Sequence, residues 1–440
     1  RRKLIPRTSV IYHTISFLLT AVDSLAQLEA LYQQAQAAGC PAALGVEAGC
    51  PFELIEYGQP APEWLRHGDK YSNCPAVTSV NLPDLRYLTP EQRKEYWFNT
   101  LFFTHAVGDK AVRQALREAG MPCTLYYNWM EIYPKESDDY PAGYHLLEHP
   151  EWINIDEKGE KRISGWGRAH NLELYSTCMH QLSLHERAAA QMRELFTGDG
   201  QVNGIFIDNC SNLPECFGDK FGVHSHQPGK DNHAMYMELL KAVYAAVKAC
   251  GKDNIVMQNN NNNPAHWSFC DTSMAEEAVI FTDWETLEYK GRLAAEAYRH
   301  GKVPSILNYL QFSYNRDTRE YYSTDEFEAI EYNCTFSYVY ARLFDMLWSA
   351  WNYLYEQEHL MPLTQRYFRL DLSNPTSPLQ QTGKVFHRDF GRYKLLLNSD
   401  RRHPAALTVD GKWRNINDDQ VYAGEIELEP YGAIILEKVD

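Results

Sequence analysis

The stretch VNGIFIDNCSN, residues 202–212, joins a short apolar run to a carboxylate. Gly204 to Ile207 are apolar in character, Asp208 follows directly, and the next residues are polar. A strand that is buried on both faces reads as a continuous apolar run, which is typical of a parallel sheet. Active-site residues of barrels and open α/β sheets lie at the carboxyl ends of such strands. Asp208 is therefore a candidate catalytic residue, and a helix N-cap is the alternative.

Helical and strand patterns alternate along the chain on both sides of this stretch. Helices are predicted over residues 26–38, 108–120, 184–200, 233–251 and 285–301. Strands are predicted over residues 121–129, 204–208, 254–258, 272–280 and 304–310. Short connections between alternating elements are typical of β/α units around a parallel sheet. The number of these units over about 370 residues favours a (β/α)8 TIM barrel. None of the predicted strands is followed by the glycine-rich loop of a nucleotide-binding site.

The pattern changes after about residue 375, as expected at a domain boundary. A polar connector, SNPTSPLQQTGK (373–384), leads into short strand patterns that turn residues separate. We predict a (β/α)8 catalytic barrel with long βα loops over residues 1–372 and a small C-terminal antiparallel β-sandwich domain over residues 380–440. The segment FDMLWSAWNYLY (344–355) has aromatic residues at helical spacing, which favours a core position.

Composition and charge exclude several classes of protein. The chain has 44% hydrophobic residues and a net charge of −16, which argue for a folded domain and against nucleic acid or an anionic membrane as partner. The ten cysteines include no CxxC pair, so the spacing of a zinc site is absent and we expect free thiols and no metal. Unpaired thiols and the lack of a clear signal peptide favour a cytoplasmic location. A processed N-terminus, export and the oligomeric state stay open.

One histidine-containing loop offers an alternative to this expectation. His224, His226 and His233 lie near Asp219 and Asp231 in the sequence. Histidine and carboxylate side chains are common metal ligands, but this spacing matches no structural zinc pattern. We therefore interpret the segment as a solvated loop.

Polar residues follow the predicted strands at the edge where parallel strands place their carboxyl ends. Asp208 and one residue of the pair Glu276 and Glu277 would face each other across this edge, two strands apart. Adjacent strand residues point to opposite faces, so only one glutamate faces the mouth, and we favour Glu276. Two carboxylates about 5 to 5.5 Å apart are what a retaining glycosidase needs, one as nucleophile and one as acid/base.

Further residues near these strand ends suit the recognition of sugar hydroxyls and the stacking of sugar rings. The asparagine run offers Asn259, next to the strand, as a ligand, whereas we interpret residues 261–263 as a solvated loop. The candidate substrate-binding residues are Asn128, Trp129, Asn209, Asn259, Glu277, Asn308, Tyr309 and Trp348.

Two segments resemble sequences of bacterial glycoside hydrolases. LLEHPEWINIDEKGEKRISGWG (146–167) contains an HP-x-W-x-x-x-D-x-x-G loop, and LHERAAAQMRELFTGDGQVNGIFIDN (184–209) ends in a DG-[IV]-F-x-D-N strand with Asn203 in place of the aspartate. Over residues 120–440 the chain resembles the α-galactosidase and endo-α-galactosaminidase-like TIM-barrel superfamily of glycoside hydrolases. This resemblance implies a nucleophile on the fourth strand, at Asp208, and an acid/base carboxylate on the sixth, at Glu276.

The resemblance implies a glycosidase that cleaves an α-linked glycosidic bond by double displacement without a cofactor. Its expected partner is an oligosaccharide or glycoside substrate. A transglycosidase or inverting hydrolase on the same barrel, a non-catalytic carbohydrate-binding barrel and a metal-dependent hydrolase are the alternatives. The first two strands do not match the family, so the sugar, its linkage and exo or endo action stay open.

Overall fold

The structure of the 440-residue chain is a computed structural model. The helix predicted over 26–38, and all but one residue of the helix predicted over 108–120, lie outside the residues that it describes. No helix within the described residues is long and apolar enough to cross a membrane. The described residues are 55–66, 76–78, 101–104, 114, 122–133, 144–145, 149–171, 173–197, 202–210, 213–277, 279–310, 312–315, 320–323, 326–351, 363, 366–367, 370, 372 and 374–439.

Eight parallel strands form the main sheet, in the same order as they follow in the chain. This order is the result of successive β/α units, and it confirms the predicted parallel α/β architecture. The two outermost strands, β1 and β13, approach each other, but no hydrogen-bonded pairing joins them within the described residues. The strands are β1 Ala76–Thr78, β2 Leu101–Thr104, β3 Cys123–Tyr127, β7 Gly204–Ile207, β8 Ile255–Asn259, β9 Thr272–Glu277, β10 Val303–Tyr309 and β13 Leu347–Trp351.

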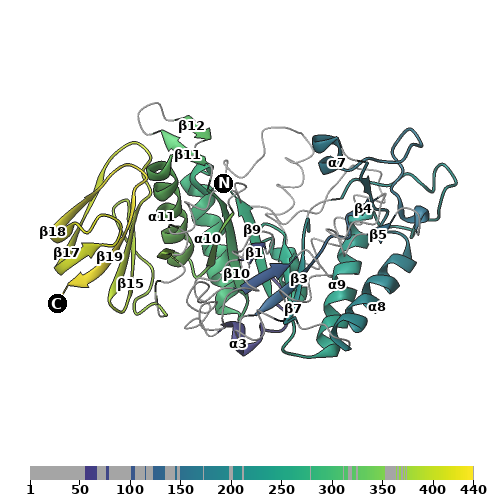
Figure 1. The fold of residues 1–440 in the computed structure, drawn as a ribbon, viewed down its shortest axis with the longest axis horizontal. Helices are drawn as coiled ribbons and strands as arrows, with labels where there is room; N and C mark the ends of the chain where they lie inside the picture. Colours follow the sequence, from purple (N-terminus) through teal and green to yellow (C-terminus); the bar gives the residue numbers. More distant parts are fainter. Residues whose placement is uncertain are drawn as a thin grey trace, which may run out of the picture.

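Helices flank the main sheet, on its left and on its right in the view of Figure 1. Three helices confirm the predicted segments to within three residues: α8 (Leu182–Thr197), α9 (Asn232–Cys250) and α10 (Trp284–Arg299). Asp231 caps α9 by accepting a hydrogen bond from the Ala234 N–H at 2.6 Å, as expected of a short acidic residue before a helix. Asp231, which the sequence analysis assigned to the histidine-containing loop, is therefore the capping residue at which α9 begins.

The sequence did not predict the fourth covering helix, α11 (Phe327–Leu343). Every residue from Asn333 to Leu343 is buried, so the helix lacks the polar stripe that makes amphipathic helices recognisable. The following segment, whose aromatic spacing favoured a core position, contains strand β13, and Trp348 in this strand is fully buried. Aromatic side chains also favour strands, and pairing with β10 decides between helix and strand here.

The strands bury different residues on their two faces, because side chains alternate along a strand. On the inner face, away from the helices, Tyr126, Phe206 and Met274 belong to one apolar cluster. On the outer face, Ile205 packs with the residues of α8 and α9, and Trp348 packs with those of α11. This alternation decides which side chains at the strand ends can meet at the inner face.

Two smaller units follow individual strands of the sheet. After β3, the strands β4 (Glu131–Tyr133), β5 (Tyr144–His145) and β6 (Tyr175–Ser176) form a three-stranded sheet. After β10, β11 (Phe312–Asn315) and β12 (Glu320–Ser323) form a hairpin. The short helical segments are α3 Glu63–Arg66, η5 Pro150–Trp152, α7 Gly165–His170, η6 Pro264–Phe269 and η7 Val279–Phe281.

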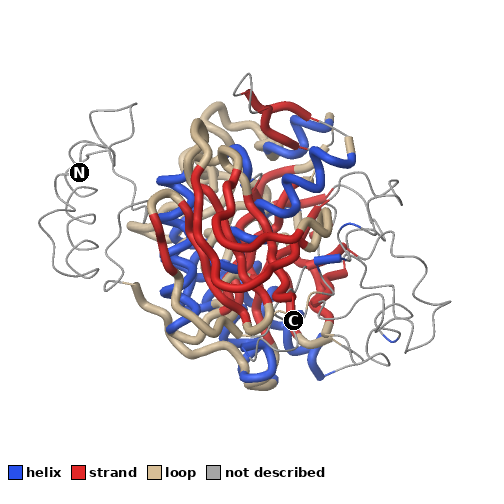
Figure 2. Tube along the Cα trace, turned by 90° about the vertical axis from the view of Figure 1, so that its left-hand side faces the viewer, coloured by secondary structure: helices blue, strands red, loops and turns tan. Residues whose placement is uncertain are grey.

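The C-terminal residues form an antiparallel sheet, which confirms the expected β domain (Figure 2). Its six strands make one continuous sheet, whereas a β-sandwich has two. The long strand β17 explains this difference, because it pairs with β18 along most of its length and with β19 near its end, around an irregularity between Val409 and Lys412. The strands are β14 Gln380–Thr382, β15 Val385–Phe390, β16 Tyr393–Asn398, β17 Ala405–Asn415, β18 Val421–Leu428 and β19 Ala433–Val439.

The C-terminal sheet packs on the helices that cover the main sheet (Figure 1). The rings of Phe336, on α11, and Tyr431 lie 4.4 Å apart, and both residues belong to an apolar cluster that spans the two units. A partly buried ion pair joins Arg388 and Asp345 at 2.8 Å. The C-terminal domain therefore shares a core with the main sheet.

Candidate active site

Asp208 lies directly after β7, two residues beyond the inner-face residue Phe206. The backbone of Asn209 is left-handed, with φ of 56°, a conformation that asparagine adopts more readily than most residues. This turn directs the Asn209 N–H to Asp208 Oδ1 at 2.8 Å, and the Asn209 side-chain amide donates to Oδ2 at 3.3 Å. The residue after the strand therefore holds the carboxylate in place.

Neighbouring strands supply two further donors to Asp208. The Tyr126 hydroxyl, from β3, donates to Oδ2 at 2.8 Å. The Asn259 amide, from the end of β8, donates to Oδ1 at 2.8 Å. Both carboxylate oxygens thus accept hydrogen bonds from donors on both sides of β7, which restricts the rotation of the side chain.

Glu276 belongs to β9 and points to the inner face, like Met274 two residues before it. It accepts hydrogen bonds from the Asn259 amide at 2.6 Å and from the Tyr309 hydroxyl on β10. Burial raises the pKa of Glu276, and the Asp208 charge raises it further, although the two hydrogen bonds act in the opposite direction. A raised pKa keeps a carboxyl protonated closer to neutral pH, as a general acid requires.

One amide nitrogen links the two carboxylates. Asn259 Nδ2 donates to Asp208 Oδ1 at 2.8 Å and to Glu276 Oε2 at 2.6 Å. These two oxygens can therefore lie no farther apart than the two distances together, 5.4 Å. A pair of carboxyl groups at this separation, with one pKa raised, can combine a nucleophile with a proton donor.

The structure brings together five of the residues that the sequence indicated: Asp208, Asn209, Asn259, Glu276 and Tyr309. Four of them occupy the ends of consecutive strands, β7 to β10, and Asn209 follows β7 directly. The sequence did not indicate Tyr126, because we took the last residues of its strand pattern as the candidates. The alternation of strand residues was the available signal, since it places Tyr126 on the inner face.

The structure does not bring the other five predicted residues to this site. For three of them, the reason is that side chains alternate between the two faces of a strand. Asn308 is fully buried on the outer face, where it donates to Asn333 Oδ1 at 3.1 Å. Trp348 is buried beside α11 and donates to Ser337 Oγ at 2.9 Å. Glu277 forms an ion pair with Lys290 of α10. Each side chain alternates with a neighbour that faces inward.

Asn128 and Trp129 follow β3 but have local structural roles. The Asn128 amide donates to Glu131 Oε2 at 3.2 Å, and its oxygen accepts the Met130 N–H at 3.0 Å. Trp129 is fully buried and stacks on Tyr127 with ring centroids 5.0 Å apart, within the cluster under α8 and α9. Stacking on a sugar, the role expected for Trp129, needs an exposed ring face that this residue lacks.

The asparagine run after β8 is more ordered than the solvated loop that the sequence indicated. Asn262 is buried and donates to the Ser305 carbonyl at 3.2 Å. Asn263 caps η6 by accepting the Ala265 N–H at 3.0 Å. The interpretation as a solvated loop is wrong for Asn262, which is buried, whereas Asn263 is a partly exposed helix cap.

Comparison with known proteins places this fold among glycoside hydrolase structures. No family model and no curated protein matches the chain. A maltogenic α-amylase, AmyB from Thermotoga neapolitana, is similar with a TM-score of 0.53 at 10% identity, over 85% of this chain and 100% of that chain. This likeness confirms the expected glycoside hydrolase fold, and at this identity it concerns the fold alone.

Two further glycoside hydrolase structures resemble the chain less closely. The cycloalternan-degrading enzyme from Trueperella pyogenes has a TM-score of 0.48 at 11% identity, over 88% of this chain and 62% of that chain. The GH36 α-galactosidase AgaA from Geobacillus stearothermophilus has a TM-score of 0.42 at 10% identity, over 77% of this chain and 51% of that chain.

Proposed function

We propose that the chain is a retaining glycoside hydrolase that cleaves an α-linked glycosidic bond. The observation that carries the proposal is the pair Asp208 and Glu276, held by one Asn259 amide at the ends of the fourth and sixth strands. We further propose that the main sheet closes into a (β/α)8 barrel within residues 1–372, followed by the antiparallel β domain of residues 380–440. The likeness in fold to the maltogenic α-amylase supports this assignment.

In the first step, Glu276 donates its proton to the glycosidic oxygen as the bond to the anomeric carbon breaks. An Asp208 oxygen attacks the same carbon from the opposite face and forms a covalent glycosyl ester. Tyr126 and Asn259 hold Asp208 in position for this attack. Because its pKa is raised, Glu276 stays protonated and can supply the proton that the leaving group needs.

In the second step, Glu276 is a carboxylate and takes a proton from water. The water oxygen then displaces Asp208 from the anomeric carbon, which restores both side chains and releases a sugar with its original configuration. The hydrogen bonds from Asn259 and Tyr309 stabilise the ionised Glu276 during this step. Two carboxylates and water suffice for this reaction.

The separation of the two carboxylates supports retention over inversion. An inverting enzyme keeps its carboxyl groups roughly 6.5 to 9.5 Å apart to admit water, whereas a retaining enzyme needs roughly 5 to 5.5 Å. The bound of 5.4 Å on the oxygen pair matches the second class. The α configuration comes from the family resemblance of the sequence.

Covalent trapping tests both the activity and the residue. The full chain is incubated with cyclophellitol-type and 2-fluoro glycosyl probes of several α-linked sugars, and the intact mass is followed by peptide mapping. We expect one adduct, on Asp208, which also names the sugar. An adduct on another residue, or release of the inverted anomer from a substrate, would contradict the proposed mechanism.

A further inference from the structure

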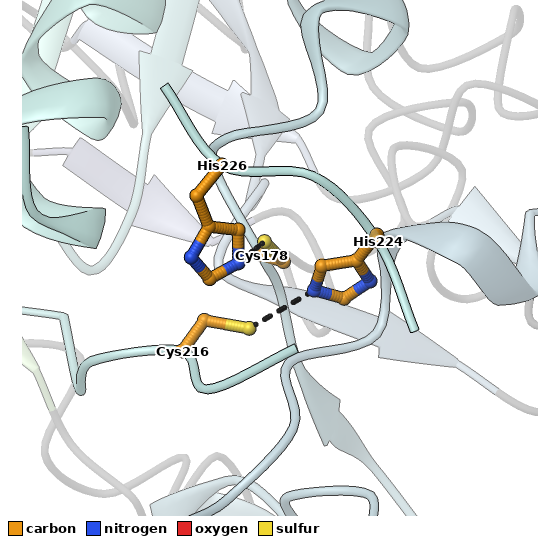
Figure 3. Close-up of side chains that lie close together, drawn as sticks. All are labelled: Cys178, Cys216, His224 and His226. Atoms are coloured by element: carbon orange, nitrogen blue, oxygen red, sulfur yellow. Dashed lines mark hydrogen bonds between the residues drawn. The ribbon is translucent and has the colours of Figure 1, made fainter. Parts of the chain in front are cut away.

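Four side chains that the proposed reaction does not use lie together beside the β3 insertion (Figure 3). They are Cys178, Cys216, His224 and His226, and one ligand atom of each lies within 4.8 Å of the others. We propose that these side chains form a structural Zn²⁺ site. The proposed site departs from the sequence-based expectation of no metal and from the interpretation of the histidine-containing segment as a solvated loop.

The distances within the cluster suit a tetrahedral zinc ion. Cys216 Sγ and His224 Nε2 lie 3.2 Å apart, and Cys178 Sγ and His226 Nε2 lie 3.6 Å apart. Zinc binds thiolate sulfur at about 2.3 Å and imidazole nitrogen at about 2.0 to 2.1 Å, which places neighbouring tetrahedral ligands roughly 3.3 to 3.8 Å apart. A small movement of the side chains is therefore enough to admit the ion.

The donor set and its burial favour zinc over a redox or alkaline-earth metal. Two cysteines with two histidines are a structural zinc set, and two thiolates neutralise the charge of one Zn²⁺. Cys178 and Cys216 are 0% and 2% exposed, and they cluster with Ile155 apart from the main cores. Filling an apolar core, the usual role of a buried thiol, does not account for this placement.

Surrounding groups already orient the ligands. Asp219 Oδ1 lies 3.2 Å from His226 Nδ1, the arrangement that fixes a metal-binding imidazole through its second nitrogen. The Ile155 N–H donates to Cys216 Sγ at 3.3 Å. These two contacts hold His226 and Cys216 in position for a shared ion.

A glycine makes room for one of the ligands. A Cβ atom built on Gly218 would lie 1.9 Å from His224 Nε2, so only glycine allows the imidazole to reach Cys216. The loop also folds back here, because the Val223 N–H donates to the Gly218 carbonyl at 2.7 Å. The tight turn and the glycine thus place His224 in the cluster.

The ion would join two loops that flank the candidate active site. Cys178 ends the insertion that follows β3, and the other three ligands belong to the loop that follows β7 and Asp208. The amide of Asn232 already links these segments, accepting the Met179 N–H at 2.6 Å and donating to the Pro214 carbonyl at 3.0 Å. All four ligands come from protein, so the ion would have no open position and a structural role.

The first test measures metal content. The full chain is purified without metal-affinity resin after growth with zinc, and metals are counted by inductively coupled plasma mass spectrometry. We expect about one zinc ion per chain, and less than about 0.2 in Cys216→Ser and in Gly218→Ala. Cys250→Ser is the matched control, because Cys250 lies on α9 outside the cluster, and it should retain the zinc.

The second test needs no substitution and covers the case in which a variant fails to fold. Zinc is replaced by Co²⁺, and we expect the absorption of tetrahedral cobalt with thiolate charge-transfer bands. Chelation should lower the Tm by about 3 °C or more, and Zn²⁺ should restore it. Zinc-free wild-type protein, an octahedral cobalt spectrum, a Cys178–Cys216 disulfide in peptide maps, or zinc retained by the Cys178→Ser/Cys216→Ser double variant would overturn the proposal.

Discussion

The carboxylate site and the cysteine–histidine cluster are built from the chain in different ways. The carboxylate site takes one side chain from the end of each of several consecutive strands, so strand order and alternation determine its composition. The cluster takes Cys178 from one loop and Cys216, His224 and His226 from another, and no repeating element relates them. The comparison teaches that a site on a regular framework can be predicted from sequence, whereas a site between loops needs the folded chain.

The two regions should also fail differently. Substitutions among the carboxylates are expected to remove activity while zinc content and stability persist, because Asp208 and Glu276 contribute little to the core. Substitutions among the thiols are expected to remove zinc and lower the Tm.

The largest effect is expected for Asp208→Asn. The amide cannot form the glycosyl ester, so kcat/KM should fall by about 10⁴-fold or more, since loss of a catalytic nucleophile has effects of this size. Initial rates on the best substrate of the probe panel measure the change. Tm and zinc content should match wild type, and wild-type turnover would show that Asp208 is not the nucleophile.

Glu276→Gln should have the next largest effect, because it removes the proton donor and base. We expect kcat to fall by about 10²- to 10⁴-fold on substrates with poor leaving groups. The loss should be smaller for an activated aryl glycoside, because its leaving group departs without protonation in the first step. Glu277→Gln is the matched control, since Glu277 pairs with Lys290, and it should change kcat less than about threefold. The reverse ranking would assign the acid/base role to Glu277.

Asn259→Ala tests the bridge between the two carboxylates. Without the shared amide, Asp208 and Glu276 lose a common donor and their spacing is less restricted. We expect kcat to fall by about 10²-fold, the usual cost of small misplacements in an active site. Steady-state kinetics measures it, and an unchanged kcat would mean that Tyr126 and Tyr309 position the carboxylates without Asn259.

Tyr309→Phe should give the smallest change in rate and a shift in pH dependence. The Tyr309 hydroxyl stabilises the ionised form of Glu276, so its removal should raise the pKa of Glu276. Glu276 acts as acid when protonated, so activity falls as pH rises through this pKa. The basic limb of kcat/KM should therefore move upward by about 0.5 to 1 pH unit. A downward shift, or no shift, would contradict this role of Tyr309.

Much of the candidate active site could be predicted from the sequence. The apolar run before Asp208 indicated a buried strand, and the order of strand patterns placed Glu276 two strands away. Asn209, Asn259 and Tyr309 followed from their positions near strand ends. The errors at Asn308 and Trp348 came from taking residues near a strand end without applying alternation, which assigns them to the outer face.

Other features could not be predicted, for identifiable physical reasons. The buried helix α11 has no polar stripe, and the strand β13 carries aromatic residues whose spacing also suits a helix. The continuous C-terminal sheet depends on where β17 changes partner, which is a matter of register between distant residues.

The parallel α/β architecture, the C-terminal β domain and the strand that carries Asp208 could be predicted from residue order alone. These features depend on local periodicity and on residues that cap helices or end strands, which neighbours in the chain specify. Only the tertiary structure decided that one Asn259 amide joins the two carboxylates, and that Cys178 lies within reach of Cys216, His224 and His226. Such contacts join segments that are far apart in the sequence. Only packing and hydrogen bonds in the folded chain bring these segments together.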